Sequence, residues 1–237
     1  MKLFLSPFSS YTYLLALAAL VAAIPLGRFY AGDGTVWTVF GGLGLVALFT
    51  VGAMQWTAIN QLGTSFRTWL KSAAVTAAAA SGVLAVVTTA SSVVNQEQNP
   101  YYTFYDAFLV VSNNPVEWVD TNGEAYMVEA AAQNAGTIMA TFAVTFAFLF
   151  FTCLIGVGAG LAAKTEYRWL PIVAAIAAVA AAVFCNVAII AYNTTEIGGE
   201  IVSIPPTYTG LLTISVATLI AAAAAAFSIA RAPRFIR

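Results

Sequence analysis

Six long runs of apolar residues dominate this sequence, and they limit the folds that the chain can adopt. A helix of about 20 apolar residues is long enough to cross the hydrocarbon core of a bilayer. We therefore predict an all-α, polytopic membrane protein, a single transmembrane domain over residues 1–237 with about six membrane-spanning helices. The predicted spans are Tyr11 to Arg28, Thr35 to Ile59, Ala73 to Val94, Thr137 to Ala162, Leu170 to Tyr192 and Gly210 to Ala230.

The composition also indicates a membrane protein, with the lipid bilayer as a partner. Apolar residues make up 61% of the sequence and charged residues only 8%, whereas soluble domains carry about 25% charged residues. A net charge of −1 argues against nucleic acid as a partner. No small-x-small cleavage motif follows the first run, so we predict a transmembrane helix there and not a cleaved signal peptide.

The distribution of charge along the chain predicts its orientation. Nine of the ten acidic residues lie in the first, third and fifth connections, together with the single cation Arg28. Cations in short loops stay on the cytoplasmic side of a membrane. Both termini are therefore predicted to be cytoplasmic in a multi-pass protein of the cell membrane, and the alanine-rich composition suggests a bacterial source. The eight cations on the predicted inner side are Lys2, Arg67, Lys71, Lys164, Arg168, Arg231, Arg234 and Arg237.

The stretch "QLGTSFRTWLKS", residues 61–72, is predicted to form a short cytoplasmic helix between the second and third spans. Cations at positions i and i+4 lie on one helical face, and the large apolar residues point another way. One interpretation is an interfacial helix that anchors the chain to lipid. The other is a helix that docks a cytoplasmic nucleotide-binding subunit. The candidate docking residues are Phe66, Arg67, Trp69, Leu70 and Lys71.

The sequence offers no motif for catalysis, and we predict no catalytic, cofactor-binding or metal-binding residues in this chain. It contains no phosphate-binding loop of the GxxxxGK[ST] type and no histidine. The span interiors lack charged residues, so the polar candidates for translocation or helix packing are Gln55 and Asn186. Gly156 and Gly160 form a Gly-x-x-x-Gly spacing that favours a close helix contact.

The longest connection, residues 95–133, is predicted to form an ordered extracellular cap between the third and fourth spans. Burial of its aromatic residues against the helix ends would make it a lid, and a ligand-binding cap is the alternative. Within it, "GEAYMVEAAAQ" is predicted to be a helical lead into the fourth span. In the last connection, "IVSI" followed by two prolines is predicted to dip into the membrane. The candidate cap residues are Tyr101, Tyr102, Phe104, Tyr105 and Trp118.

Six spans, two cytoplasmic termini, "INQLGTSFRTWLKS" after the second span and a proline-containing loop before the sixth resemble the permease subunits of type-2 ABC exporters. The resemblance implies an assembly of two permeases, ATP and Mg²⁺ on a cytoplasmic partner subunit, and an amphipathic or hydrophobic substrate. One alternative is a non-catalytic accessory or scaffold subunit of a larger membrane complex, as a homo- or hetero-oligomer. A small-molecule carrier that uses hydroxyls, aromatics and backbone for specificity is the other.

Overall fold

The computed structural model describes residues 2–6, 10–197, 200–203 and 208–235. Within these residues, six helices are long and apolar enough to span a membrane, which confirms the predicted all-α polytopic fold. The spans are α2 (Ser10–Ala31), α3 (Gly34–Met54) continued by the short α4 (Trp56–Gln61), α5 (Phe66–Gln98), α6 (Ala135–Ala162), α7 (Leu170–Tyr192) and α8 (Thr209–Phe235). The chain is therefore a multi-pass membrane protein.

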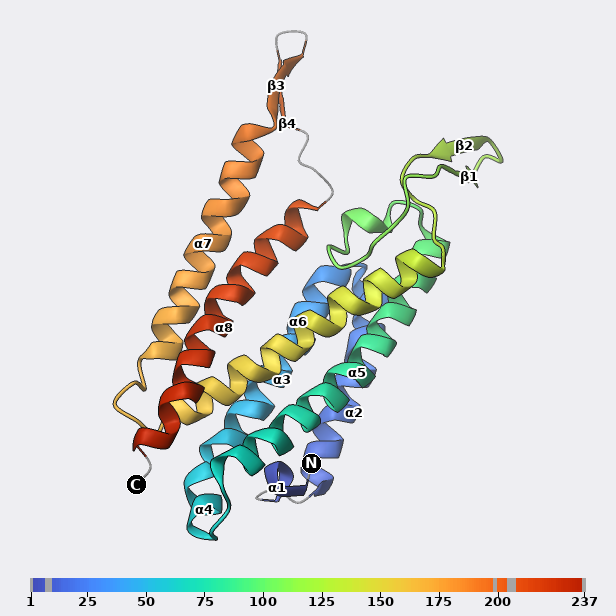
Figure 1. The fold of residues 1–237 in the computed structure, drawn as a ribbon. Helices are drawn as coiled ribbons and strands as arrows, with labels where there is room; N and C mark the ends of the chain where they lie inside the picture. The colour runs from blue at the N-terminus through green and yellow to red at the C-terminus, as the bar shows by residue number, and fades with distance from the viewer. Residues whose placement is uncertain (1, 7–9, 198–199, 204–207, 236–237) are drawn as a thin grey trace.

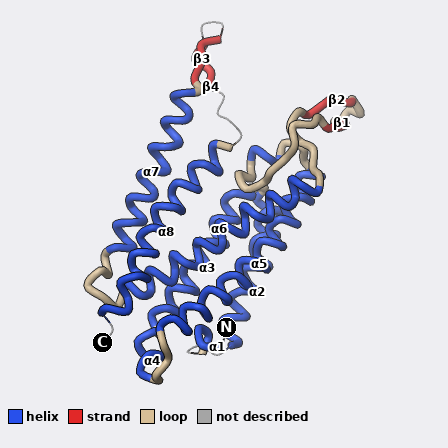
Figure 2. The backbone as a smooth tube through the Cα atoms, viewed as in Figure 1, coloured by secondary structure: helices blue, strands red, loops and turns tan. Residues whose placement is uncertain are grey.

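The helices form two groups that share α6. Helices α2, α3, α5 and α6 pack together, whereas α7 contacts mainly α8, and α8 packs on α6 (Figure 1). Both termini lie at the same end of the bundle, together with α4 (Figure 1). We call this the terminal end. The opposite end carries two short β-hairpins, which are the only strands among the described residues (Figure 2). We call it the hairpin end.

Glycines allow α6 to approach its neighbours closely. A Cβ atom placed on Gly156 would lie 2.6 Å from the Val46 carbonyl oxygen of α3, and one on Gly160 would lie 2.3 Å from that of Thr50. On another face of α6, a Cβ on Gly158 would lie 2.4 Å from the Cα of Ala225 in α8. These three positions admit no side chain without a shift of the helices, because backbone atoms of the neighbours occupy the space.

The helix α1 (Lys2–Leu5) closes the terminal end of the core. Its Phe4 ring is fully buried and stacks on Phe49 of α3, with 5.1 Å between the ring centroids. The Phe4 amide donates to Ser72 Oγ of α5 at 3.1 Å. This short helix therefore joins α3 to α5 where the two helices leave the apolar core.

The segment between α5 and α6 contains a 3₁₀ turn, η1 (Tyr102–Phe104), and an antiparallel hairpin of β1 (Val116–Val119) and β2 (Ala125–Val128). The predicted helical lead into the fourth span is wrong, because residues 125–128 pair with β1. Gly123 has φ +85° at the hairpin turn, a conformation that glycine adopts without strain. Helix α6 begins only after Asn134, which forms a capping box with Thr137.

The connection between α7 and α8 contains the second hairpin, β3 (Thr194–Ile197) and β4 (Glu200–Ser203). Most of the predicted "IVSI" stretch is therefore the paired strand β4. The two prolines of the predicted membrane dip fall within 204–207, which lie outside the described residues.

Candidate functional site

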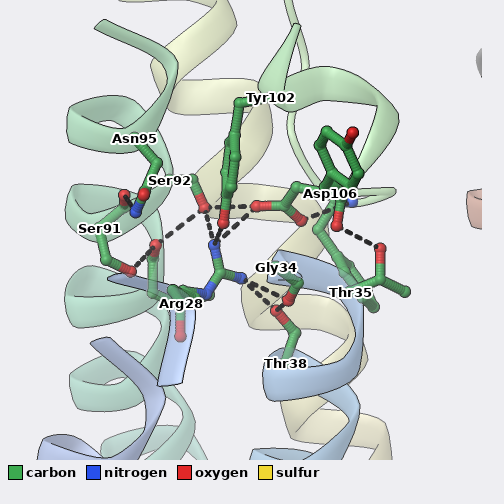
Figure 3. Close-up of polar contacts among 12 residues, drawn as sticks. Arg28, Gly34, Thr35, Thr38, Ser91, Ser92, Asn95, Tyr102 and Asp106 are labelled. Atoms are coloured by element: carbon green, nitrogen blue, oxygen red, sulfur yellow. Dashed lines mark hydrogen bonds and ion pairs between the residues drawn. The ribbon is translucent and has the colours of Figure 1, made fainter. Parts of the chain in front are cut away.

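A fully buried arginine, Arg28, joins four elements at the hairpin end of the bundle. Its Nη1 donates to Asp106 Oδ2 at 2.6 Å and to Ser92 Oγ at 2.5 Å, and the Tyr102 hydroxyl lies 3.5 Å away. Its Nη2 donates to the Gly34 carbonyl at 3.0 Å and to the Thr38 hydroxyl. The guanidinium thus connects the end of α2 to α3, α5 and the segment after η1 (Figure 3). We call this set of contacts the Arg28 network.

A tight turn between α2 and α3 brings Arg28 to its partners. Gly32 follows α2 with φ +74°, and its amide donates to the Arg28 carbonyl at 3.0 Å, a geometry typical of helix C-termini. Asp33 then caps α3 by accepting from the Val36 amide at 2.9 Å. Gly34 leaves room for the network, since a Cβ there would lie 2.6 Å from the carboxylate of Asp106.

Asp106 is held from several directions. Its Oδ2 also accepts from Ser92 Oγ at 2.8 Å, and its Oδ1 accepts from the Phe108 amide at 3.2 Å. Thr35 of α3 forms hydrogen bonds with both neighbours of Asp106. The Thr35 amide donates to the Tyr105 carbonyl at 3.0 Å, and the Ala107 amide donates to Thr35 Oγ1 at 2.8 Å. Residues 105–108 are therefore fixed to the start of α3.

The electrostatics of the network are those of a desolvated ion pair. The side chains of Arg28 and Asp106 are both 0% exposed, so each charge relies on the other and on the surrounding hydroxyls in place of water. Burial raises the pKa of Tyr102 to about 12, and the tyrosine is neutral at physiological pH. The side chains of the network are all buried, so the arrangement orders the chain at this end.

Sequence reasoning did not select Arg28 or Asp106 as site residues. Arg28 is the only cation among nine acids in the connections at this end. A lone cation among acids was the feature that could have indicated a buried ion pair. An arginine near the apolar core needs an acidic or carbonyl partner. The sequence did not indicate which acid it would be, because Asp106 is 78 positions away.

The predicted cap residues divide into a buried and an exposed set. Tyr102 is 3% exposed and belongs to the Arg28 network. Phe104 and Tyr105 are 73% and 52% exposed, and Tyr101 stacks on Phe104 and on Tyr126 of β2. Trp118 on β1 is half-buried. The segment is thus anchored through residues 102 and 105–109, with an aromatic surface above this anchor.

The predicted docking residues form the first turns of α5 and not a separate helix. Ser65 caps α5, whose first residue is Phe66. Trp69 is 0% exposed and packs within the chain, with its ring centroid 5.7 Å from that of Phe4 and 5.0 Å from that of Trp56. The Trp69 side chain is therefore not available to a partner in this conformation, and Phe66 and Leu70 are half-buried around it.

The exposed side chains of this region belong to a turn at the terminal end. Leu62, between α4 and α5, is 84% exposed, and Arg67 and Lys71 on α5 are also exposed. We call residues 61–71 the α4–α5 corner. Its surface is a protruding leucine beside two cations, and the aromatic residues predicted to dock a partner lie beneath it.

The remaining predicted residues lie apart from one another. Gln55 is exposed at the break between α3 and α4, and Gly156 and Gly160 contact α3 as described above. Asn186 lies on the outer surface of α7 and is exposed, whereas the sequence predicted that it would face another helix. The structure does not bring these four residues together into a translocation path.

An apolar groove runs between α6 and α8 near the hairpin end. Its cavity of about 290 Å³ is bounded by Phe108 from the anchored segment and by Phe148 and Phe151 of α6. Ser215 and Thr218 of α8 contribute its hydroxyl groups. An aliphatic chain or an aromatic ring fits such a surface better than a polar solute does.

The described residues contain no group of three or more His, Cys, Asp or Glu side chains that could hold a metal ion. Comparisons with models of protein families, with curated proteins and with solved structures found no match.

Proposed function

We propose that the chain is the membrane-spanning permease subunit of an ATP-driven exporter, with ATP and Mg²⁺ bound by a separate cytoplasmic subunit. The observation that carries this proposal is the α4–α5 corner. There α3 breaks at Gln55, continues as α4 and reverses into α5, and the turn presents Leu62, which is 84% exposed. A protruding apolar side chain flanked by cations is a suitable anchor for a groove with an acidic rim on a partner.

The packing beneath the corner supports a role in transmitting movement. Trp56 of α4 lies 5.3 Å from Phe66 and 5.0 Å from Trp69 of α5, measured between ring centroids. Rigid aromatic packing of this kind makes α4 and the start of α5 move together. A partner that pulls on the corner would therefore displace two membrane-spanning helices.

The charge distribution supports a cytoplasmic position for the α4–α5 corner, on the side that contains ATP. Arg67, Lys71, Lys164 and Arg168 are all exposed at the terminal end, and short loops rich in cations remain cytoplasmic. The apolar groove between α6 and α8 suits an amphipathic or hydrophobic substrate, because most of the side chains that line it are apolar.

Purification in mild detergent from the native membrane tests the proposal. We expect a nucleotide-binding subunit to co-purify, and we expect its ATP hydrolysis to be faster in the complex than alone. A Leu62→Ala, Arg67→Ala and Lys71→Ala triple variant should lose the subunit. A Lys164→Ala and Arg168→Ala variant, which removes two exposed cations at the same end, is the matched control and should retain it.

The alternative function is a non-catalytic scaffold subunit of a larger membrane complex. The buried Arg28 network favours it, because this network fixes the hairpin end in one arrangement and an exporter must change its arrangement there. Recovery of a stable complex without any ATP-hydrolysing subunit would support the scaffold and contradict the exporter.

A further inference from the structure

Helix α7 carries an amide where its surroundings are apolar. Asn186 is the only amide or charged side chain in α7, and it is exposed on the outer surface of the helix. It is five residues from the midpoint of the 23-residue helix, roughly 8 Å along the axis at 1.5 Å per residue. Asn186 therefore lies within the hydrocarbon core, where lipid tails offer no hydrogen bond to its amide.

Polar side chains in the apolar part of α5 are buried, unlike Asn186. Among them are the hydroxyl side chains of Ser81, Thr88 and Ser92. On α7 the buried residues are Ala174 and Ala178, on the face toward α8. Asn186 lies on another face, and no described residue forms a hydrogen bond with its side chain.

Asn186 belongs to a continuous stripe of exposed residues. Spacings of four and three residues alternate along the stripe, as in a heptad repeat, and at 100° per residue its members fall within an arc of roughly 80°. All members of the stripe except Asn186 are β-branched, so their side chains lose little rotamer freedom on packing. The α7 stripe consists of Ile172, Ile176, Val179, Val183, Asn186 and Ile190.

We infer that the α7 stripe packs against the α7 stripe of a second copy of this chain, with the two Asn186 amides hydrogen-bonded to each other. Two copies inserted with the same orientation place Asn186 at the same depth. Around a two-fold axis, each amide N–H then meets the carbonyl oxygen of the other. A carboxamide is both donor and acceptor, so the pair satisfies itself, which a lipid tail cannot do.

The α7 stripe is exposed along the helix, so a second copy can reach it. Helix α7 lies at the edge of the molecule, and α8 and α6 cover only one side of it (Figure 1). A single Asn within an apolar heptad stripe also fixes the register of two helices, since any shift leaves both amides unpaired. This pairing does not depend on the proposed function, because it needs no ATP-hydrolysing partner.

Cysteine cross-linking of the purified chain, reconstituted at low density in phosphatidylcholine vesicles, tests the pairing. In a Cys153→Ala and Cys185→Ala background, Val179→Cys should form a disulfide-linked species of two chains. Ala177→Cys is the matched control: it is exposed at nearly the same depth but lies outside the stripe, and it should cross-link at least tenfold more slowly. Equal rates at the two positions, no cross-linking at Val179→Cys, or a species of more than two chains would overturn the inference.

A second experiment isolates the amide. Adding Asn186→Leu to the cross-linking chain should weaken association by about tenfold, the size of effect expected for a polar contact between membrane helices. Gln55→Leu removes another exposed amide and should change association less than twofold. Counting photobleaching steps of the otherwise unmodified chain, labelled at its C-terminus, should give two copies per particle. Single copies, or an Asn186→Leu variant that associates as the parent does, would contradict the pairing.

Discussion

Neutralising Asp106 should destabilise the protein strongly, because the charge of Arg28 would remain buried. Both side chains are 0% exposed and their atoms lie 2.6 Å apart. An Asp106→Asn substitution keeps the shape of the side chain but removes the negative charge. Loss of one partner of a buried ion pair costs about 3–5 kcal/mol, since the other charge stays desolvated. We expect the free energy of unfolding to fall by about that amount.

Unfolding by SDS in mixed micelles, followed by far-ultraviolet circular dichroism, measures the effect. Glu97→Gln is the matched control, because Glu97 is an exposed acid near the same end and should cost less than about 0.5 kcal/mol. An Arg28→Met and Asp106→Leu double variant should be more stable than either single variant, since it leaves no unpaired charge. The reasoning would be refuted if Asp106→Asn lowered the free energy of unfolding by less than about 1 kcal/mol. It would also be refuted if the loss in the double variant equalled the sum of the losses in Arg28→Met and Asp106→Leu.

Three further changes test other parts of the structure. Gly34→Ala places a Cβ 2.6 Å from the Asp106 carboxylate, and the overpacking should lower the free energy of unfolding by about 1–3 kcal/mol in the same assay. Trp69→Ala empties a fully buried site and should cost about 3–5 kcal/mol, whereas Arg67→Ala, on the exposed face of the same helix, should cost less than about 0.5 kcal/mol. Hydrogen bonds from backbone amides hold the pKa of Asp120 below its usual 3.8. Hydrogen exchange should therefore show more protection at the β1–β2 turn above that pH, and less as the pH falls through the lowered pKa, and Asp120→Ala should abolish this pH dependence.

The membrane spans could be predicted closely because they depend on a local property. The structure has α7 at Leu170–Tyr192, as predicted. The other five predicted spans fall within the observed helices, which extend beyond them by up to seven residues. A long apolar segment in a bilayer has to satisfy its backbone groups internally, and a helix does so without any distant partner. Length and hydropathy are therefore sufficient to place it.

The segment between α5 and α6 could not be predicted in the same way. Glu, Ala and Met in residues 124–133 favour a helix locally, but pairing with Val116–Val119 makes residues 125–128 a strand. Tertiary pairing overrode local preference, as it commonly does in short segments. The Arg28 network escaped prediction for a related reason, since it joins residues from four separate elements.

The α4–α5 corner shows that a correct local pattern does not reveal which face of a helix is covered. Helical spacing did separate Arg67 and Lys71 from Trp69, and the structure places the cations outside and the tryptophan inside. The sequence could not show that Phe4 and Trp56 would cover the apolar face, because these contacts join α5 to α1 and α4. The apolar face is thus part of the core, and Leu62 is the exposed apolar residue.

The side of the membrane on which the α4–α5 corner lies is the most direct test of the exporter proposal, because ATP is available only in the cytoplasm. In a Cys153→Ala and Cys185→Ala background, Gln61→Cys at the corner and Asn113→Cys at the hairpin end are both exposed positions. With a membrane-impermeant maleimide on intact cells, we predict that Asn113→Cys is labelled at once and that Gln61→Cys is labelled only after permeabilisation. Labelling of Gln61→Cys in intact cells, with Asn113→Cys protected, would contradict the account.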